Sequence, residues 1–159
     1  MVGIDPGLVA TGYGCLERTP SGVAVMDVGV ISTPPGELIE IRLSAIHQAV
    51  GALLEKHAPS LLAVEDLYTE YRFPRTAILM GHARGVICLA AAQRGITVLA
   101  VAPAEVKRMI TANGAASKLQ VQRGVQAMLG LGELPRPSHV ADALSLALTG
   151  MSRVSGRVQ

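Results

Sequence analysis

One short apolar run places the strongest constraint on what this chain can fold into. Residues 61–64 are Leu-Leu-Ala-Val, and Glu65 follows them directly. A continuous apolar run of this length is typical of a strand that is covered on both faces of its sheet. The fold must therefore supply helices to both sides of that strand.

The segments around this run supply the rest of a sheet and its covering layers. Strand patterns at 2–4, 11–16 and 22–31 are separated by turn residues, which indicates an antiparallel meander. Apolar periodicity and capping residues predict one further strand at 96–101 and helices at 37–57, 74–94, 103–110, 117–129 and 138–150. We therefore expect an α/β fold with a mixed five-stranded sheet, forming one domain over 1–152 with a flexible tail at 153–159.

Composition narrows the function only slightly. The 159 residues are 50% hydrophobic, but no uncharged stretch approaches the roughly 18 residues that span a bilayer. The first residues enter a strand pattern without the features of a signal peptide, so we expect a cytoplasmic protein that does not contact membranes. A net charge of +2 does not by itself indicate a nucleic-acid partner. Cys15 and Cys88 are expected to be small buried hydrophobes, with a disulfide or metal role as the alternative.

Four residues that can carry metal chemistry lie at the predicted ends of elements. Asp5 ends the first strand, Glu65 ends the apolar run, and His139 and Asp142 share one face of the last helix. Each has a simpler interpretation: Asp5 as a turn residue, Glu65 as a salt-bridge partner of an arginine, and the helical pair as solvated groups at a helix N-terminus. Together they favour a hard cation, because several carboxylates that converge at strand ends are costly without one.

Carboxylates on two neighbouring strands, crossed by a late helix, form the arrangement of the ribonuclease H-like fold. The sequence also resembles the RuvC-type Holliday junction resolvases over nearly its whole length. The resemblance rests on an ordered set of motifs: GIDPG at 3–7, TGYG at 11–14, VE at 64–65, GHARG at 81–85, VK at 106–107, SKLQVQ at 117–122 and ADAL at 141–144.

The resemblance implies a metal site made of Asp5, Glu65, His139 and Asp142, which would hold two Mg²⁺ or Mn²⁺ ions roughly 3.5–4 Å apart. Many relatives have an aspartate where this chain has His139. An imidazole ligand carries less negative charge and would move the metal preference from Mg²⁺ toward Mn²⁺. His139 could instead titrate near neutral pH and order the attacking water.

Candidate DNA-binding residues lie outside this group. Three of the four aromatic residues fall between 68 and 73, beside two arginines, a composition that suits base stacking and phosphate contacts. A hydrophobic plug for the loop is the alternative. Lysines near the predicted helix start at Ser117 suit phosphate binding, although each could be a solvated surface charge. The resemblance implies an aromatic wedge at Tyr68 and DNA-contacting lysines at Lys107 and Lys118. Together with the two arginines, the predicted DNA-binding residues are Tyr68, Arg72, Arg75, Lys107 and Lys118.

The helix predicted at 74–94 carries small residues at spacings of three to four: Ala77, Gly81, Gly85 and Cys88. Such a face can pack within its own subunit. The resemblance implies instead a homodimer interface, and a two-fold dimer matches the symmetry of a four-way DNA junction. The resemblance also implies a partner in recombination and repair, a branch-migration motor complex of the RuvA–RuvB type.

These observations predict a metal-dependent endonuclease that makes paired, symmetric nicks in four-way junctions and leaves 5′-phosphate ends. One alternative is a branched-DNA-binding protein without catalytic activity, which would retain junctions without nicking them. Another is an actin-like phosphotransferase, whose first strand can also read Gly-Ile-Asp-x-Gly. That class needs two related domains around a cleft, and 159 residues are too few.

Overall fold

The computed structural model describes residues 1–67 and 74–156. The strands are β1 (Val2–Asp5), β2 (Ala10–Thr19), β3 (Gly22–Ser32), β4 (Leu61–Glu65) and β5 (Thr97–Val101). The helices are α1 (Ile39–His57), α2 (Pro74–Ala92), α3 (Pro103–Thr111), α4 (Lys118–Leu129) and α5 (Ser138–Ser155). The predicted elements are therefore all present, in the predicted order.

The strands form one mixed sheet in the order β3-β2-β1-β4-β5. The first three strands pair antiparallel, as the meander pattern predicts, whereas β4 pairs in parallel with both β1 and β5. In this register Ile4 lies beside Val64 and Asp5 lies opposite Gly12. The carboxyl ends of β1 and β4 consequently meet at the same edge of the sheet.

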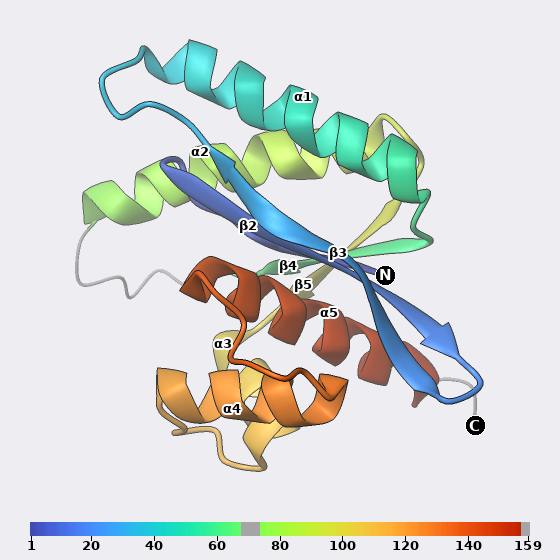
Figure 1. The fold of residues 1–159 in the computed structure, drawn as a ribbon. Helices are drawn as coiled ribbons and strands as arrows, with labels where there is room; N and C mark the ends of the chain where they lie inside the picture. Colours follow the sequence, from blue (N-terminus) through green and yellow to red (C-terminus); the bar gives the residue numbers. More distant parts are fainter. Residues whose placement is uncertain (68–73, 157–159) are drawn as a thin grey trace.

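Helices cover both faces of the sheet, as the apolar run at β4 requires (Figure 1). One apolar core joins α1 and α2 to one face, through Ile4, Leu62 and Val64 among others. A second core joins α3, α4 and α5 to the other face, through Ala63 and Val101. Because side chains alternate along a strand, Asp5 and Glu65 project toward the face that α5 covers.

Helix α5 approaches the sheet closely because two strand residues lack a side chain. A Cβ atom on Gly12 would lie 2.1 Å from the backbone oxygen of His139, and one on Gly3 would lie 2.1 Å from that of Ala143. Real Cβ atoms do not make such contacts, so glycine is required at both positions for α5 to lie where it does. The backbone of the helix therefore rests directly on β1 and β2.

Helix α5 is longer than the sequence pattern indicated. We expected it to end near Gly150, but it continues to Ser155, so residues 153–155, which we assigned to the tail, belong to the helix. Gly150 is not a terminator: a Cβ on it would lie 3.1 Å from that of Ala63, which marks a tight contact with β4. Residues 157–159 lie outside the described part of the chain.

Two further expectations from the sequence, on the cysteines and on membrane-spanning helices, can be compared with the structure. Both cysteines are free; Cys15 is buried and Cys88 is half-buried, in agreement with the expected small hydrophobes. Within residues 1–67 and 74–156, none of the helices has the length and apolar character needed to cross a membrane.

Candidate metal centre

The first two acidic residues of the predicted site lie at the carboxyl ends of adjacent parallel strands. Asp5 is the last residue of β1 and Glu65 the last of β4. Both are largely buried, and the side chain of Asp5 keeps only 11% of its exposure. Parallel pairing of β1 with β4 thus brings together two carboxylates that are sixty residues apart in the sequence.

Helix α5 adds the third and fourth residues from its first two turns. His139 Nδ1 lies 2.7 Å from Asp5 Oδ2. One ligand atom each from Asp5, His139 and Asp142 can be chosen so that all three lie within 4.8 Å of one another. That spacing lets a single ion contact all three side chains. The spacing of three between His139 and Asp142 gives them this common orientation, as the sequence predicted.

Glu65 is not part of this three-residue group, but it shares a cavity with Asp142. The cavity has a volume of about 330 Å³. Lys107, Lys118 and Ser145 are its other polar lining residues, and the rest of its wall is apolar, from Pro103, Val106, Val121 and Leu146. Glu65 and Asp142 therefore face a common space at the surface of the site.

The site is electrostatically unfavourable without a cation. The pKa of Glu65 is raised to about 7, first by burial and then by the negative charges of Asp5 and Asp142, while Lys118 acts in the opposite direction. The pKa of Asp5 is also raised, chiefly by burial, and its hydrogen bond with His139 opposes that shift. Buried like charges of this kind are a recurring feature of functional sites.

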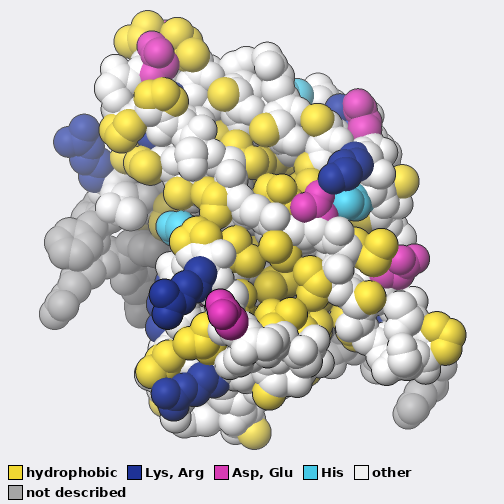
Figure 2. All heavy atoms as spheres, in the orientation of Figure 1, with side chains coloured by type: hydrophobic (Ala, Val, Ile, Leu, Met, Phe, Trp, Pro, Cys, Tyr) yellow, Lys and Arg dark blue, Asp and Glu magenta, His cyan; other side chains and the backbone are white. Residues whose placement is uncertain are grey.

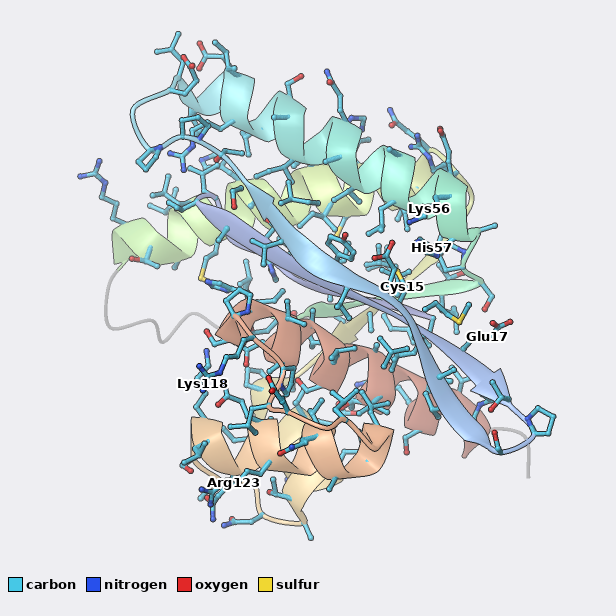
Figure 3. The ribbon with its side chains drawn as sticks, viewed as in Figure 1. Cys15, Glu17, Lys56, His57, Lys118 and Arg123 are labelled. Carbon is cyan, nitrogen blue, oxygen red and sulfur yellow. The ribbon has the colours of Figure 1, made fainter. Side chains whose placement is uncertain are left out.

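Lys118 partly neutralises the site in the structure. Its Nζ lies 2.7 Å from Asp142 Oδ2. Ser117 caps α4 by accepting from the Gln120 amide, and the Gln120 side chain accepts in return from the Ser117 amide, which fixes the first turn that carries Lys118. Figure 3 shows Lys118 at the start of α4, beside the first turns of α5. The sequence marked Lys118 as a DNA-binding candidate but did not indicate this ion pair.

An arginine fixes the end of β4 through the main chain. Arg84 Nε donates to the backbone oxygen of Glu65 at 2.9 Å, and Arg84 Nη2 lies 3.8 Å from Asp66 Oδ1. A salt bridge from Glu65 to an arginine was the simpler interpretation of this residue in the sequence. Among the described residues, no ion pair involves the Glu65 carboxylate, so the arginine holds the backbone and leaves that carboxylate directed at the site.

The predicted DNA-binding residues fall in two regions. Tyr68 and Arg72 lie outside the described residues, and Arg75 is exposed in the first turn of α2. Lys107 and Lys118 both line the cavity beside Glu65. In Figure 2, dark blue Lys and Arg side chains gather over α4, whereas the centre of this face is largely hydrophobic. The two lysines thus adjoin the acidic group.

The predicted dimer residues lie on α2 but do not all face outward. Gly85 is exposed, and no atom lies within 4 Å of the position that a Cβ on it would take, whereas Ala77, Gly81 and Cys88 are half-buried. The most exposed apolar side chains of α2 each follow a predicted interface residue by one position: Ile78 follows Ala77, and Leu89 follows Cys88. Ile78 keeps 61% of its exposure and Leu89 keeps 50%.

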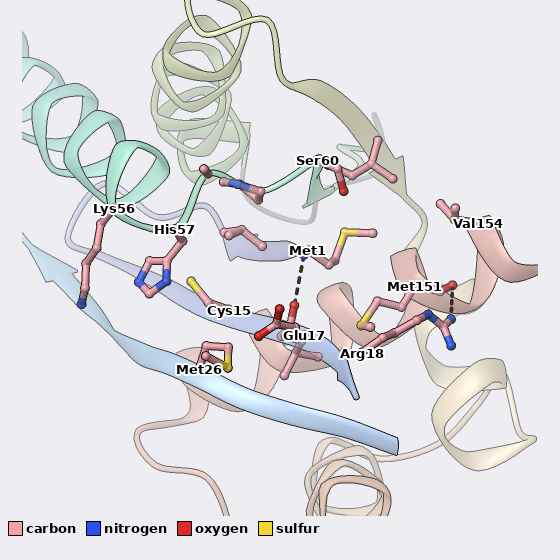
Figure 4. Close-up of a pocket in the computed structure, with 15 residues that line it drawn as sticks. Met1, Cys15, Glu17, Arg18, Met26, Lys56, His57, Ser60, Met151 and Val154 are labelled. Atoms are coloured by element: carbon pink, nitrogen blue, oxygen red, sulfur yellow. Dashed lines mark hydrogen bonds between the residues drawn. The ribbon is translucent and has the colours of Figure 1, made fainter. Parts of the chain in front are cut away.

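A second cavity, larger than the one beside Glu65, lies at the other end of the sheet and holds none of the predicted site residues. Its volume is about 670 Å³, and it is lined by residues that include Met1, Cys15, His57 and Met151 (Figure 4). These residues adjoin the start of β1 and the end of α5, whereas the acidic group adjoins the end of β1 and the start of α5. Cavity size alone therefore does not single out the acidic group.

Comparison with known proteins agrees with the fold. The family model described as crossover junction endodeoxyribonuclease RuvC matches residues 1–150. The chain belongs to the RuvC family. The crossover junction endodeoxyribonuclease RuvC of Rhodopirellula baltica is 44% identical, over 94% of this chain and 84% of that protein. The protein of the same description from Moorella thermoacetica is also 44% identical, over 93% of this chain and 88% of its own length.

A solved structure described as T. thermophilus RuvC in complex with Holliday junction substrate has a TM-score of 0.89 to this chain at 36% identity. The match covers 98% of this chain and 96% of that one. The ribonuclease H-like fold expected from the sequence is confirmed. This RuvC-family chain is accordingly a crossover junction endodeoxyribonuclease, that is, a Holliday junction resolvase, and the family membership removes the actin-like phosphotransferase from consideration.

Proposed function

We propose that this RuvC-family enzyme resolves Holliday junctions by metal-dependent hydrolysis, with Asp5, Glu65, His139 and Asp142 as the residues that hold the metal. The observation that carries the proposal is the convergence of Asp5, His139 and Asp142 within 4.8 Å, beside a Glu65 whose pKa is raised to about 7. The products are expected to carry 5′-phosphate and 3′-hydroxyl ends.

The donor set fits divalent ions of the Mg²⁺ or Mn²⁺ type. Three carboxylates supply hard oxygen ligands, and one imidazole adds a nitrogen that Mn²⁺ accepts more readily than Mg²⁺. Two such ions, when bound, would activate a water molecule and stabilise the leaving oxygen of the phosphodiester. The burial that raises the pKa of both Asp5 and Glu65 is the cost that a bound cation would offset.

Each residue has a role that follows from its position. Asp5 is the most buried of the four and lies 2.7 Å from His139, and it would be a ligand of both ions. Glu65 at the end of β4 and Asp142 on α5 would each hold one ion. His139 would complete the second ion's ligands or orient the attacking water through its other ring nitrogen, Nε2.

The lysines would exchange partners when DNA binds. Lys118 neutralises Asp142 in the structure, but a cation held by Asp142 would compete with that ion pair. Lys118 would then be released toward a phosphate oxygen of the bound strand, and Lys107 lines the same cavity. Backbone phosphate contacts of this kind position the substrate without reading its sequence.

The direct test uses a synthetic mobile four-way junction with Mn²⁺, with cleavage mapped to single nucleotides on all four strands. Paired nicks at symmetric positions in two like strands support the proposal. Asp5→Asn should abolish nicking but retain junction binding, because removing negative charge near a phosphate does not weaken the DNA complex electrostatically. An Asp5→Asn variant that nicks at the wild-type rate contradicts the metal assignment, and wild-type retention without nicking supports the binding-only alternative.

Paired nicks require two sites, and we propose that α2 supplies the homodimer interface. The exposed apolar residues Ile78 and Leu89 lie on one face of α2 with Gly85 between them, a spacing of seven and four residues. The absence of a side chain at Gly85 lets a second helix approach closely. A two-fold pair of subunits joined here would present two identical sites to a symmetric junction.

Two extensions stay predictions. One is that a single domain covers residues 1–152, which the continuous sheet and its two cores support. The other is cooperation with a branch-migration motor complex of the RuvA–RuvB type.

A further inference from the structure

Arg42 is a buried cation without an acidic partner among the described residues. The residue keeps only 8% of its exposure, in the first turn of α1. Its Nη2 is buried and makes no hydrogen bond to any described residue, and Arg42 takes part in none of the ion pairs of the described chain. Burying a charge in this way costs free energy, so a specific role for it should be sought.

The one side-chain partner of Arg42 in the described chain leads to the turn that follows Asp5. Arg42 Nε donates to Thr33 Oγ1 at 2.9 Å. The Thr33 hydroxyl in turn donates to the backbone oxygen of Leu8 at 2.5 Å, and the Thr33 amide donates to the oxygen of Val9 at 3.1 Å. The guanidinium polarises the hydroxyl between them and so strengthens its bond to Leu8.

The turn held in this way connects β1 to β2. Asp5 ends β1 and Ala10 begins β2, so residues 6–9 set how the chain leaves Asp5. Thr11 adds a third restraint, since its hydroxyl donates to the oxygen of Gly7 at 2.7 Å. Three consecutive backbone oxygens, those of residues 7, 8 and 9, therefore each accept a hydrogen bond from a threonine hydroxyl or amide.

We propose that Arg42 is a positioning residue for the metal site: through Thr33 it fixes the turn at residues 6–9 and thereby the direction of the Asp5 carboxylate. The inference rests on the proposed metal site. Stability alone would favour a different side chain, because an apolar residue of similar volume in place of a buried charge is often neutral or stabilising. The cation is explained if it holds the metal ligand rather than the fold.

The test compares Arg42→Met, Thr33→Val and wild type by calorimetric titration of Mn²⁺, well below the melting temperature. Both variants should bind Mn²⁺ about tenfold more weakly, the lower end of the effect seen when groups behind a metal ligand are removed. Arg42→Met should keep or raise the melting temperature. On a four-way junction, kcat should fall while KM stays near that of wild type, because DNA contacts are untouched. Arg42→Lys, which retains a cationic donor, should recover part of the Mn²⁺ affinity.

Arg94→Met is the matched control. Arg94 also has a buried nitrogen without a hydrogen-bond partner among the described residues, but it pairs with Glu55 and contacts the oxygen of Ala90, away from the site. This variant should lose thermal stability and keep the Mn²⁺ affinity. Equal weakening of Mn²⁺ binding by Arg94→Met would overturn the proposal, as would wild-type affinity in Arg42→Met and Thr33→Val. Should Arg42→Met fail to fold, Thr33→Val decides.

Amide hydrogen exchange in the metal-free protein separates this inference from the proposed metal site. If Arg42 holds the turn, the two amides that hydrogen-bond within it, that of Thr33 to Val9 and that of Gly7 to Thr11, should exchange about tenfold faster in Arg42→Met, a change that corresponds to ~1.4 kcal/mol of local opening free energy. Wild-type protein that binds no Mn²⁺ would refute the metal site, while faster exchange would still support the positioning role. Unchanged exchange at these amides refutes the role of Arg42.

Discussion

Glu65→Gln should stabilise the metal-free protein at pH 8 and leave its stability unchanged at pH 4.5. The folded-state pKa of Glu65 is about 7, against an ordinary value of 4.5. Below pH 4.5 the carboxyl is neutral in both folded and unfolded chains and costs nothing. As the pH rises from 4.5 to 7, the unfolded chain ionises first, so the folded state loses stability through this window.

The size of the effect follows from the same values. About 2.5 pH units at ~1.4 kcal/mol each give ~3.5 kcal/mol, and the remaining solvent contact of Glu65 lowers the expectation to roughly 2–3 kcal/mol. The neutral amide of Gln avoids this cost at every pH. For a chain of this length the change corresponds to a rise in melting temperature of roughly 4–12 °C.

The effect can be measured by urea unfolding of wild type and variant in the presence of EDTA. The difference in free energy of unfolding between the two proteins is determined at pH 4.5 and at pH 8, and the two values are compared. Added Mn²⁺ should reverse the order at pH 8, because the wild type gains stability from the bound ion and the variant gains less. Exposed Glu37→Gln serves as the control and should match wild type at both pH values. If the stabilisation by Glu65→Gln is the same at pH 4.5 and pH 8, the proposed electrostatic cost at the site is wrong.

Three further predictions address other parts of the molecule. Gly12→Ala should lower the melting temperature and reduce the nicking rate by about 100-fold, because the added Cβ displaces the first turn of α5. Gly132→Ala is the control: there is open space around Gly132, so neither quantity should change. A Gly12→Ala variant with wild-type activity would contradict the close packing. His139→Asp should raise the rate of nicking in Mg²⁺ relative to Mn²⁺, and an unchanged ratio would remove His139 from direct contact with the ion. Leu89→Asp should convert the proposed dimer to a monomer, as measured by light scattering. Met128 on α4 is equally exposed, and Met128→Asp should leave the dimer intact. A dimeric Leu89→Asp variant would argue against the α2 interface.

Much of the fold follows from local patterns in the sequence. The run at 61–64 predicted a strand covered on both faces, and β4 indeed contacts a core on each side. Ser117 predicted the start of α4, and its capping box is formed. The end of α5 was missed because a glycine in a helical pattern indicates either a terminator or a close contact. Only the tertiary packing of Gly150 against Ala63 distinguishes the two.

Some features of the candidate site could likewise be predicted from the sequence, whereas others depend on tertiary packing. Asp5, Glu65, His139 and Asp142 could be selected as candidates because each stands near the end of an element. The fold then brings Asp5, His139 and Asp142 within 4.8 Å of one another and places Glu65 in one cavity with Asp142. The ion pair of Lys118 with Asp142 depends on how α4 packs beside α5, which no local pattern encodes. The same holds for Arg42, because its partner Thr33, and Leu8 to which Thr33 donates, come from two other segments. The hydrophobic periodicity of a sequence does not indicate which buried cationic residue will lack an acidic partner.

Helix α5 has a practical consequence for finding ligands of this enzyme. The helix that carries His139 and Asp142 also has eleven buried residues, from Val140 to Met151. Because α5 is part of the central core, its first turns cannot unfold locally while the rest of the protein stays folded. A compound that binds at these turns therefore stabilises the whole fold. Occupancy of the site should therefore be reported by unfolding of the whole molecule, so a simple dye-based melting screen can detect inhibitors without any DNA substrate.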